Sequence, residues 1–395
     1  HLSIRRQRQM CIRDRSIEVS SEKYDRPLLI ITMILLAIGT VMVFSSSSDI
    51  SMDKFGSGTF YFRRHLLRVF VGLAVMVAAI FIDYRLLKQI AAPLFIASIV
   101  LLIATKVTFF IAGDYSPARW LYLGPFRIQT SDLARFATII YLATYINKKR
   151  DGIGDYVNGF LPPVIMAGIV MALIIIQPDY STAVMIGLIT TTMLFIGRAK
   201  LTHMLATGAV GMTILIPVMI AEPYRLYRIT SFIRGIFDFS GANYQLQQSI
   251  ISLGNGGIIG VGLGGSVGKN LFLPAPHTDF ILAIVGEEIG FGGIFVLITL
   301  YLAVFHRALK ITKGCTDVFG IMLGIGLSVQ IVSYAFINAS VVTGIVPTTG
   351  LPIPFISFGG SGLLINLLSV GILLNISMAK RTVSRRSEVR IRFAK

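Results

Sequence analysis

The sequence predicts an all-α, polytopic membrane protein with about ten transmembrane helices. Of its 395 residues, 54% belong to the hydrophobic set and only 14% are charged, which is more apolar surface than a soluble core can bury. Several apolar stretches reach about 18 residues or more, the length that lets a helix cross about 30 Å of hydrocarbon. The basic residues gather in short runs between these stretches. We therefore expect a bilayer to be the solvent for most of the chain.

Ten apolar segments define one predicted membrane domain over residues 27–380. They fall at about 27–47, 65–84, 89–105, 133–147, 159–176, 180–197, 201–221, 279–305, 318–343 and 361–379. Basic tails, 1–26 and 381–395, flank the domain. Residues 1–16 carry five arginines, no apolar periodicity and no initiating Met. We treat them as a candidate for non-native sequence and leave them out of the fold prediction.

The charge distribution orients the predicted helices. With the N-terminus in the cytoplasm, 24 of the 36 Lys and Arg residues lie on the inner side and 10 on the outer side, as the positive-inside rule requires. We expect a protein of the cytoplasmic (inner) membrane with both termini in the cytoplasm. The net charge of +17 then reflects topology and not nucleic acid binding, because the basic residues do not form one patch interleaved with aromatic residues.

The positions of the cysteines and histidines argue against a disulfide-bonded or zinc-binding structure. Cys11 and Cys315 both fall in predicted cytoplasmic segments, so no disulfide framework is expected. The five histidines are scattered, without the spacing of a zinc site.

The predicted outer face carries the segments long enough to do more than connect helices. Residues 106–132 form one, and residues 222–278, between helices seven and eight, form the longest. Function concentrates in such loops. A third segment, 344–360, has no charge but is rich in Gly, Pro and Ser, so we expect it to dip into the protein.

A glycine-rich run precedes the eighth helix. Residues 254–268 hold eight glycines in fifteen positions, and glycine lets backbone amides approach a phosphate closely. The run matches neither the P-loop nor the dinucleotide fingerprint. A flexible surface loop is the alternative interpretation.

Asp279 stands at the membrane boundary where the chain enters the eighth helix, directly after His277 and Thr278. A carboxylate in that place is a candidate general base. Because the helix dipole favours a negative charge at a helix N-terminus, the alternative is a cap that only stabilises the helix.

Four further charged residues fall within predicted helices. Glu287 and Glu288 interrupt an apolar segment, where an unpaired carboxylate costs at least about 2.5 kcal/mol. Helical geometry places Glu287 about 80° around the helix from Asp279 and Glu288 on the opposite face. Glu287 could therefore help to shape the cavity beside Asp279. Pairing with a structural partner is the stronger hypothesis for both Glu287 and Glu288. Asp132 and Arg135 are spaced for an i,i+3 ion pair.

Arginines on the predicted outer side are candidates for binding an anionic lipid headgroup. They are Arg119, Arg225, Arg228 and Arg234, and the arginine fork suits phosphate. Ordinary solvated charge is the alternative.

Read in order, several motifs resemble the SEDS family (shape, elongation, division and sporulation) over most of residues 27–380. The motifs are Ala118-Arg119-Trp120, Leu123-Gly124-Pro125, Ile128 to Arg135, Gln177-Pro178-Asp179, Pro223-Tyr224-Arg225, Arg228 to Phe232, Tyr244 to Ser249, the glycine run, Pro276 to Phe280, Gly286 to Gly290, Asn338, Pro347 to Pro352 and Pro354 to Ser361. Two of them, Gln245 to Ser249 and Gly260 to Gly264, resemble the division branch more than the elongation branch. The sporulation branch is close to the division branch.

The chain departs from the family pattern in the fourth helix. The resemblance leads us to expect Pro-Ser-Glu followed by Lys, whereas this chain has Thr130-Ser131-Asp132 and Arg135. The charge signs are kept, so the ion pair is expected to survive with altered geometry.

The resemblance implies a peptidoglycan glycosyltransferase that polymerises lipid II at the outer face of the membrane, with Asp279 as the essential carboxylate. We expect substrate contacts from Arg119, Arg225, Arg228, Gln245, Gln248, His277, Thr278, Ser357 and Ser361, and support from Asp132, Arg135, Glu287 and Glu288. The implied partners are a class B penicillin-binding transpeptidase and other division membrane proteins at the septum. No tightly bound cofactor is expected, and Mg²⁺ or Mn²⁺ is a candidate cation with no assigned ligands.

Two other functions stay open at this point. A bundle with intramembrane acids also suits a lipid II flippase, and a scaffold that recruits a transpeptidase would need no catalytic Asp279. Within the family, the elongation role is the alternative to division.

Overall fold

The computed structural model describes residues 24–393, apart from 113–118, 124–125, 270–272 and 275. In chain order its elements are α2 (Arg26–Phe55), α3 (Phe60–Phe81), α4 (Leu86–Ala112), β1 (Trp120–Leu123), β2 (Phe126–Gln129), α5 (Thr130–Lys148), η2 (Tyr156–Phe160), α6 (Leu161–Ile176), α7 (Tyr180–Ile196), α8 (Leu201–Ile220), α9 (Pro223–Phe237), η3 (Phe239–Gly241), α10 (Tyr244–Gly256), α11 (Ile281–Lys313), α12 (Val318–Val342) and α13 (Ser361–Phe393). The predicted helical membrane fold is therefore confirmed. The candidate non-native residues 1–16 lie outside the described residues.

Each of the ten predicted segments coincides with a helix. Eight helical stretches within the described residues are long and apolar enough to cross a membrane, and α7 is a shorter apolar helix. The count of ten crossings stays a prediction. β1 and β2 add a short antiparallel hairpin in which Trp120 faces Gln129 across the ladder.

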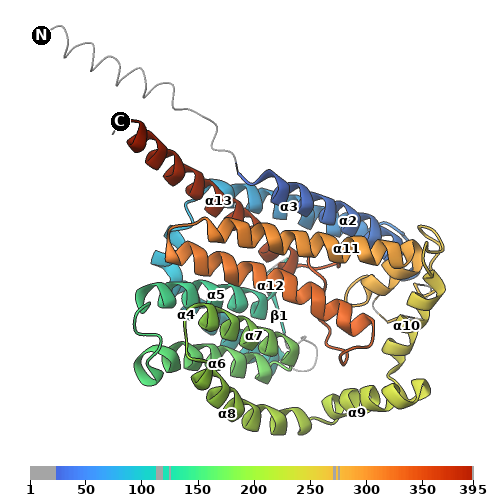
Figure 1. The fold of residues 1–395 in the computed structure, drawn as a ribbon. Helices are drawn as coiled ribbons and strands as arrows, with labels where there is room; N and C mark the ends of the chain where they lie inside the picture. The colour runs from blue at the N-terminus through green and yellow to red at the C-terminus, as the bar shows by residue number, and fades with distance from the viewer. Residues whose placement is uncertain (1–23, 113–118, 124–125, 270–272, 275, 394–395) are drawn as a thin grey trace, which may run out of the picture.

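The core of the bundle lies between α2, α3, α5, α11, α12 and α13 (Figure 1). The helices exposed most fully are peripheral: none of the residues of α8 is buried. Such a helix is stable only where its apolar sides face lipid, since water would solvate them poorly.

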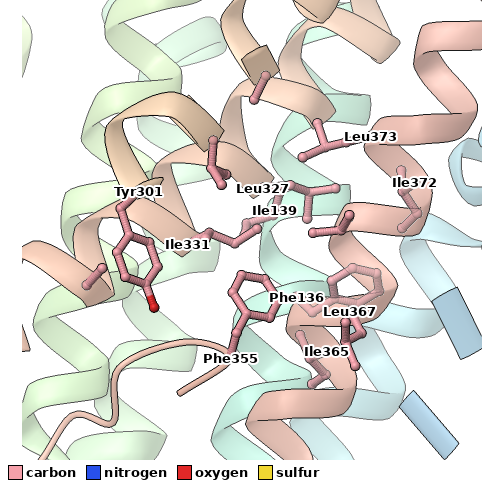
Figure 2. Packing of buried hydrophobic residues seen from close by; sticks show 14 of the residues in the cluster. Phe136, Ile139, Tyr301, Leu327, Ile331, Phe355, Ile365, Leu367, Ile372 and Leu373 are labelled. Atoms are coloured by element: carbon pink, nitrogen blue, oxygen red, sulfur yellow. The ribbon is translucent and has the colours of Figure 1, made fainter. Parts of the chain in front are cut away.

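Residues 344–360 dip into the bundle, as predicted. Phe355 and Ile356 are almost completely buried, and Figure 2 shows Phe355 directed into the same cluster as Phe136 and Ile331. A Cβ built on Gly39 of α2 would lie 2.2 Å from the Phe355 carbonyl oxygen, so only glycine lets α2 approach this loop so closely. We call residues 344–360 the re-entrant segment.

The connection between α8 and α11 is more ordered than the predicted loop. It folds into α9, η3 and α10, and α10 packs on α11 and α12. The Ser249 hydroxyl of α10 donates to the Val342 carbonyl at 2.8 Å, which fixes α10 against the end of α12.

The glycine-rich run is docked against a break in α11, so the interpretation as a flexible loop is wrong. Gly290 interrupts the helix with φ 75°. The freed backbone groups pair with the run: the amides of Val261 and Gly262 donate to the carbonyls of Glu287 and Glu288, both at 3.0 Å. The glycines serve close backbone packing, and these amides are not free to bind a phosphate.

Candidate active site

Asp279 precedes the first residue of α11 by two positions, at the N-terminal end of that helix. The N-cap position is Phe280, and no side chain makes the capping hydrogen bond. The carboxylate therefore does not cap the helix, so the alternative interpretation of Asp279 as a helix cap is not supported.

The backbone around Asp279 is held from two sides. Asn338 of α12 donates from its side-chain amide to the carbonyls of Asp279 and Leu351, both at 2.7 Å. The Ser357 hydroxyl donates to the Thr278 carbonyl at 2.6 Å. These bonds fix the carboxylate between α12 and the re-entrant segment.

Two arginines set the electrostatics of the Asp279 carboxylate. Burial raises its pKa above the ordinary value, and the charges of Arg228 and Arg119 oppose that rise. A raised pKa makes the ionised carboxylate a stronger base, and the nearby positive charges favour its ionised form.

The re-entrant segment leaves space beside the carboxylate. Gly350 has φ +75°, and a Cβ built there would lie 3.4 Å from the Oδ2 atom of Asp279. A larger residue would be strained in this conformation and would narrow the approach to Asp279.

Several buried polar atoms around Asp279 have no hydrogen-bond partner among the described residues. They are Thr348 Oγ1, Thr349 Oγ1, Arg228 Nε, Asn338 Oδ1 and His277 Nδ1. Buried polar atoms are nearly always paired. These groups are therefore candidates for contacts with a polar ligand beside Asp279.

Arg228 is positioned by the re-entrant segment and by its own helix. Its Nη1 donates to the Thr348 carbonyl at 3.0 Å, and its Nη2 donates to the Tyr224 hydroxyl at 2.5 Å. The guanidinium also lies 4.6 Å from the centroid of the Tyr224 ring. Its Nε is buried and has no hydrogen-bond partner among the described residues.

Arg119 and Arg225 are held by carbonyl groups at the ends of neighbouring helices. Arg119 donates to the Pro178 carbonyl. Arg225 donates to the Val218 carbonyl at 3.2 Å and lies 5.3 Å from the centroid of the Tyr180 ring. Of these two, only Arg119 has a charge that acts on Asp279.

The structure does not bring every predicted substrate residue to Asp279. Ser361 donates to the Asp132 carboxylate at 2.8 Å and accepts from the Gln129 amide, so it belongs to the supporting network. Gln245 and Gln248 lie half-buried on α10 without a described side-chain hydrogen bond to the Asp279 region. Their substrate roles stay predictions.

His277, two residues before Asp279 in the sequence, is uncharged and packs against two aromatic rings. Its ring lies 4.9 Å from that of Tyr61 and 5.5 Å from that of Phe358, measured between centroids. Burial, with a smaller contribution from Lys54, lowers the pKa of His277 to about 4. The imidazole is therefore uncharged at neutral pH.

The predicted pair of Asp132 and Arg135 is present, with 3.1 Å between Oδ1 and Nη2. Arg135 also donates to the hydroxyl of Tyr334 on α12. The sequence did not reveal that Asp179 belongs here too: it accepts from Gln129 Nε2 at 2.9 Å and from Ser131 Oγ at 3.0 Å. The sequence pointed to Asp179 only through the Gln177-Pro178-Asp179 motif, and that motif does not identify the residues that hydrogen-bond to Asp179.

Glu287 and Glu288 are both used structurally. Glu287 accepts from Ser266 Oγ at 2.5 Å and from the Val267 amide at 3.1 Å, which is the structural pairing that the sequence favoured; a part in shaping the Asp279 cavity stays a prediction. Glu288 accepts from Ser45 Oγ at 2.6 Å and lies 3.6 Å from Lys269 Nζ. The buried acids hold the glycine-rich run to α11 and α2.

Fold and site together define a polytopic membrane protein with a cluster of polar and charged side chains at the N-terminal end of α11. The family model described as a cell cycle protein, that of FtsW, RodA and SpoVE, matches residues 26–382. The chain belongs to this family, as the SEDS resemblance predicted.

Curated relatives and a solved structure span nearly the whole chain. A probable peptidoglycan glycosyltransferase FtsW from Trichlorobacter lovleyi is 38% identical, over 90% of this chain and 93% of that protein. The stage V sporulation protein E of Bacillus subtilis is 34% identical, over 90% and 98%. A chain in a solved peptidoglycan synthase complex matches with a TM-score of 0.73 at 24% identity, over 90% of this chain and 98% of that one, which supports the fold.

Proposed function

We propose that this protein polymerises lipid II into glycan strands at the outer face of the cytoplasmic membrane, for septal wall synthesis during division. The observation that carries the proposal is Asp279: a half-buried carboxylate beside the start of α11, with the charges of Arg228 and Arg119 acting on it and unpaired polar atoms nearby among the described residues. The FtsW relatives are named as glycosyltransferases of this kind.

The reaction is a single displacement. The 4-hydroxyl oxygen of an acceptor GlcNAc attacks the anomeric carbon of a donor MurNAc and inverts its α linkage to β. The bond from that carbon to the diphosphate oxygen breaks, and its electron pair leaves with undecaprenyl diphosphate. Asp279 takes the hydroxyl proton.

The neighbouring cations suit the leaving group. Negative charge develops on the diphosphate as the bond breaks, and preorganised donors stabilise it best where water is excluded. Arg228 Nε is buried and unpaired among the described residues, and Thr348 and Thr349 add two unpaired hydroxyls. Arg119 supplies a second positive charge close enough to act on Asp279.

We propose that a divalent cation enters the site together with the substrate. Among the described residues no group of three His, Cys, Asp or Glu side chains could hold a metal. Mg²⁺ commonly uses one or two carboxylates plus substrate phosphates, so Mg²⁺ or Mn²⁺ would reach this site on the diphosphate.

The same proposal covers topology and partners. The basic inner segments support a cytoplasmic location for both termini. The similarity to a chain of a peptidoglycan synthase complex supports a class B penicillin-binding transpeptidase as the membrane partner, within the division machinery.

A lipid II flippase is less well supported. The sequence basis for it was the pair of intramembrane acids, and these are occupied by Ser266, Ser45 and Lys269. A liposome assay separates the two functions, because polymer from externally supplied lipid II requires the enzyme, whereas translocation without polymer requires a transporter.

The test of the proposed function is Asp279→Asn in purified protein reconstituted with its transpeptidase and lipid II. Removing a general base typically lowers the rate by about 10²–10⁴-fold, so polymer should nearly vanish. Asp238→Asn is the matched control, since Asp238 is an exposed acid of the same outer connection whose carboxylate bonds only to Ser240 among the described residues. Undiminished polymer from Asp279→Asn would remove Asp279 from the mechanism.

A further inference from the structure

A cavity at the opposite end of the bundle from Asp279 takes no part in the proposed reaction. Its volume is about 660 Å³, and it lies between the turn that joins α3 to α4 and the turn that joins α11 to α12 (Figure 1). The described residues that line it are Arg85, Lys88, Gln89 and Asp317. Pockets of roughly 300–1,000 Å³ commonly hold small ligands. Because α11 spans 33 residues, roughly 50 Å of helix at 1.5 Å per residue separates the cavity from Asp279.

Tyr84 holds the two turns against each other. It is almost completely buried, and its hydroxyl donates to Asp317 Oδ2 at 3.4 Å. Its ring stacks on that of Phe319 in the first turn of α12, with 6.2 Å between the centroids and 11° between the ring planes. The Tyr84 amide donates to Asn375 Oδ1 of α13 at 3.1 Å. The charged side chains of the two turns therefore line a cavity that the fold has already formed.

The lining of the cavity carries two cations and one carboxylate. Among the described residues, neither Arg85 nor Lys88 forms an ion pair. Asp317 Oδ2 accepts from an amide of its own helix and from the Tyr84 hydroxyl, whereas Oδ1 has no hydrogen-bond partner in the part of the chain that the structure describes. Asp83 is not among the lining residues, and it accepts from the Arg85 amide at 2.9 Å. A matching ligand has one negative charge for the cations and a hydrogen-bond donor for the carboxylate.

Exposed apolar side chains adjoin the charged lining in the sequence. Phe81 and Ile82, at the end of α3, are 81% and 54% exposed, and Leu86 and Ile90, in the first turns of α4, are 48% and 47% exposed. In the proposed orientation both turns lie on the cytoplasmic side, so lipid of the inner leaflet covers these side chains. Basic pockets between transmembrane helices on that side bind phospholipid headgroups.

We propose that this cavity binds the headgroup of an inner-leaflet phospholipid of the phosphatidylglycerol class. Arg85 and Lys88 bind the single negative charge of the phosphodiester, and a headgroup hydroxyl donates to Asp317 Oδ1. The acyl chains lie on Phe81 and Leu86. Phosphatidylethanolamine has no net charge and leaves one positive charge of the lining uncompensated, and free phosphate has no chains to cover the apolar residues. The inference rests on the proposed orientation and not on the proposed reaction.

Native mass spectrometry of the full-length protein in detergent measures its affinity for the first added phospholipid. Phosphatidylglycerol should bind about 10-fold or more tighter than phosphatidylmethanol, which has the same charge but no headgroup hydroxyl, because a hydrogen bond to a charged group is worth a factor of this size. It should also bind tighter than phosphatidylethanolamine. Asp317→Asn keeps a side chain that caps a helix well and should remove most of the preference for phosphatidylglycerol over phosphatidylmethanol.

The double variant Arg85→Gln with Lys88→Gln should bind phosphatidylglycerol about 10-fold or more weakly than the parent, since hydrogen bonds to a charged group are lost. Arg198→Gln with Lys200→Gln is the matched control, because these exposed cations belong to the turn between α7 and α8 and are not among the lining residues. It should bind like the parent. Melting temperatures without added lipid show that both double variants fold.

Three results would overturn the inference. They are equal weakening in the two double variants, equal affinity of the parent for phosphatidylglycerol and phosphatidylmethanol, and displacement of phosphatidylglycerol by inorganic phosphate, which would identify a site for a free anion. The binding measurement contains no lipid II, so its failure would leave the proposed reaction standing.

Discussion

At the residue scale, the position of Asp279 was predictable from sequence but its setting was not. The sequence placed it at the start of an outer helix, and the structure adds that Asn338 and Ser357 hold its neighbouring carbonyls. Those partners lie 59 and 79 residues away from the groups they bond, and no local pattern encodes such contacts. Arg228 and Arg119 meet the carboxylate by the same long-range folding.

The raised pKa of Asp279 makes the rate of polymerisation depend on pH. The base works only when ionised, so activity should fall on acidification through a pKa above that of an ordinary aspartate. Since the Arg228 charge lowers the pKa of Asp279, Arg228→Gln should move the midpoint to higher pH. Initial rates of lipid II polymerisation between pH 4 and 9 measure this. Arg225→Gln provides the comparison, because its charge does not act on Asp279; equal midpoints in both variants would contradict the account.

Asn338 is expected to be a positioning residue. Asn338→Ala leaves the carbonyls of Asp279 and Leu351 without their donor, which costs about 1–3 kcal/mol of stability and should lower kcat more than it changes KM. Asn375→Ala is a matched control: that amide also joins two backbone groups, at Ile80 and Tyr84, at and just after the C-terminal end of α3. A loss of kcat equal in both variants would mean that stability alone explains the effect.

At the element scale, the sequence predicted the helices and not the way their connections dock. Apolar runs identify α2 or α12 directly, because each run is long enough to cross a bilayer. The glycine-rich run could not be placed, since its partners are backbone groups freed where α11 breaks at Gly290. Structural pairing was predicted for the two acids of α11, but their hydrogen-bond partners could not be named because they come from distant segments.

Glycine in the docked run is required by space as well as by conformation. Gly260 has φ +90°, and a Cβ there would lie 2.3 Å from the Glu288 carbonyl oxygen; Gly262 has φ +95° with nothing within 4 Å. Gly260→Ala should therefore lower the free energy of unfolding by about 1–3 kcal/mol more than Gly262→Ala, the typical cost of overpacking. Thermal unfolding of both variants in the same detergent measures the difference, and equal losses would show that the run is not held in this register.

At the scale of the whole molecule, the two ends of α11 make separate contacts. The described contacts of Asp279 gather at the N-terminal end of α11, while the C-terminal part of that helix bonds to the start of α2. Arg307 donates to Asp25 at 2.6 Å and 3.2 Å, and the Asp25 amide donates to Ser377 of α13 at 3.0 Å. About 26 residues of helix, roughly 40 Å at 1.5 Å per residue, separate Arg307 from the site. Sites so far apart are expected to act independently.

This separation predicts a variant that loses stability without losing chemistry. Arg307→Gln leaves the buried Asp25 carboxylate without its cation, so unfolding should become easier by about 1–2 kcal/mol for a partly exposed pair. Polymerisation by the folded fraction should stay unchanged, because the diphosphate and Asp279 are at the opposite end. Arg26→Gln, an exposed arginine beside Asp25, is the control and should change neither property. Equal losses of stability in Arg307→Gln and Arg26→Gln would show that the loss does not come from the ion pair.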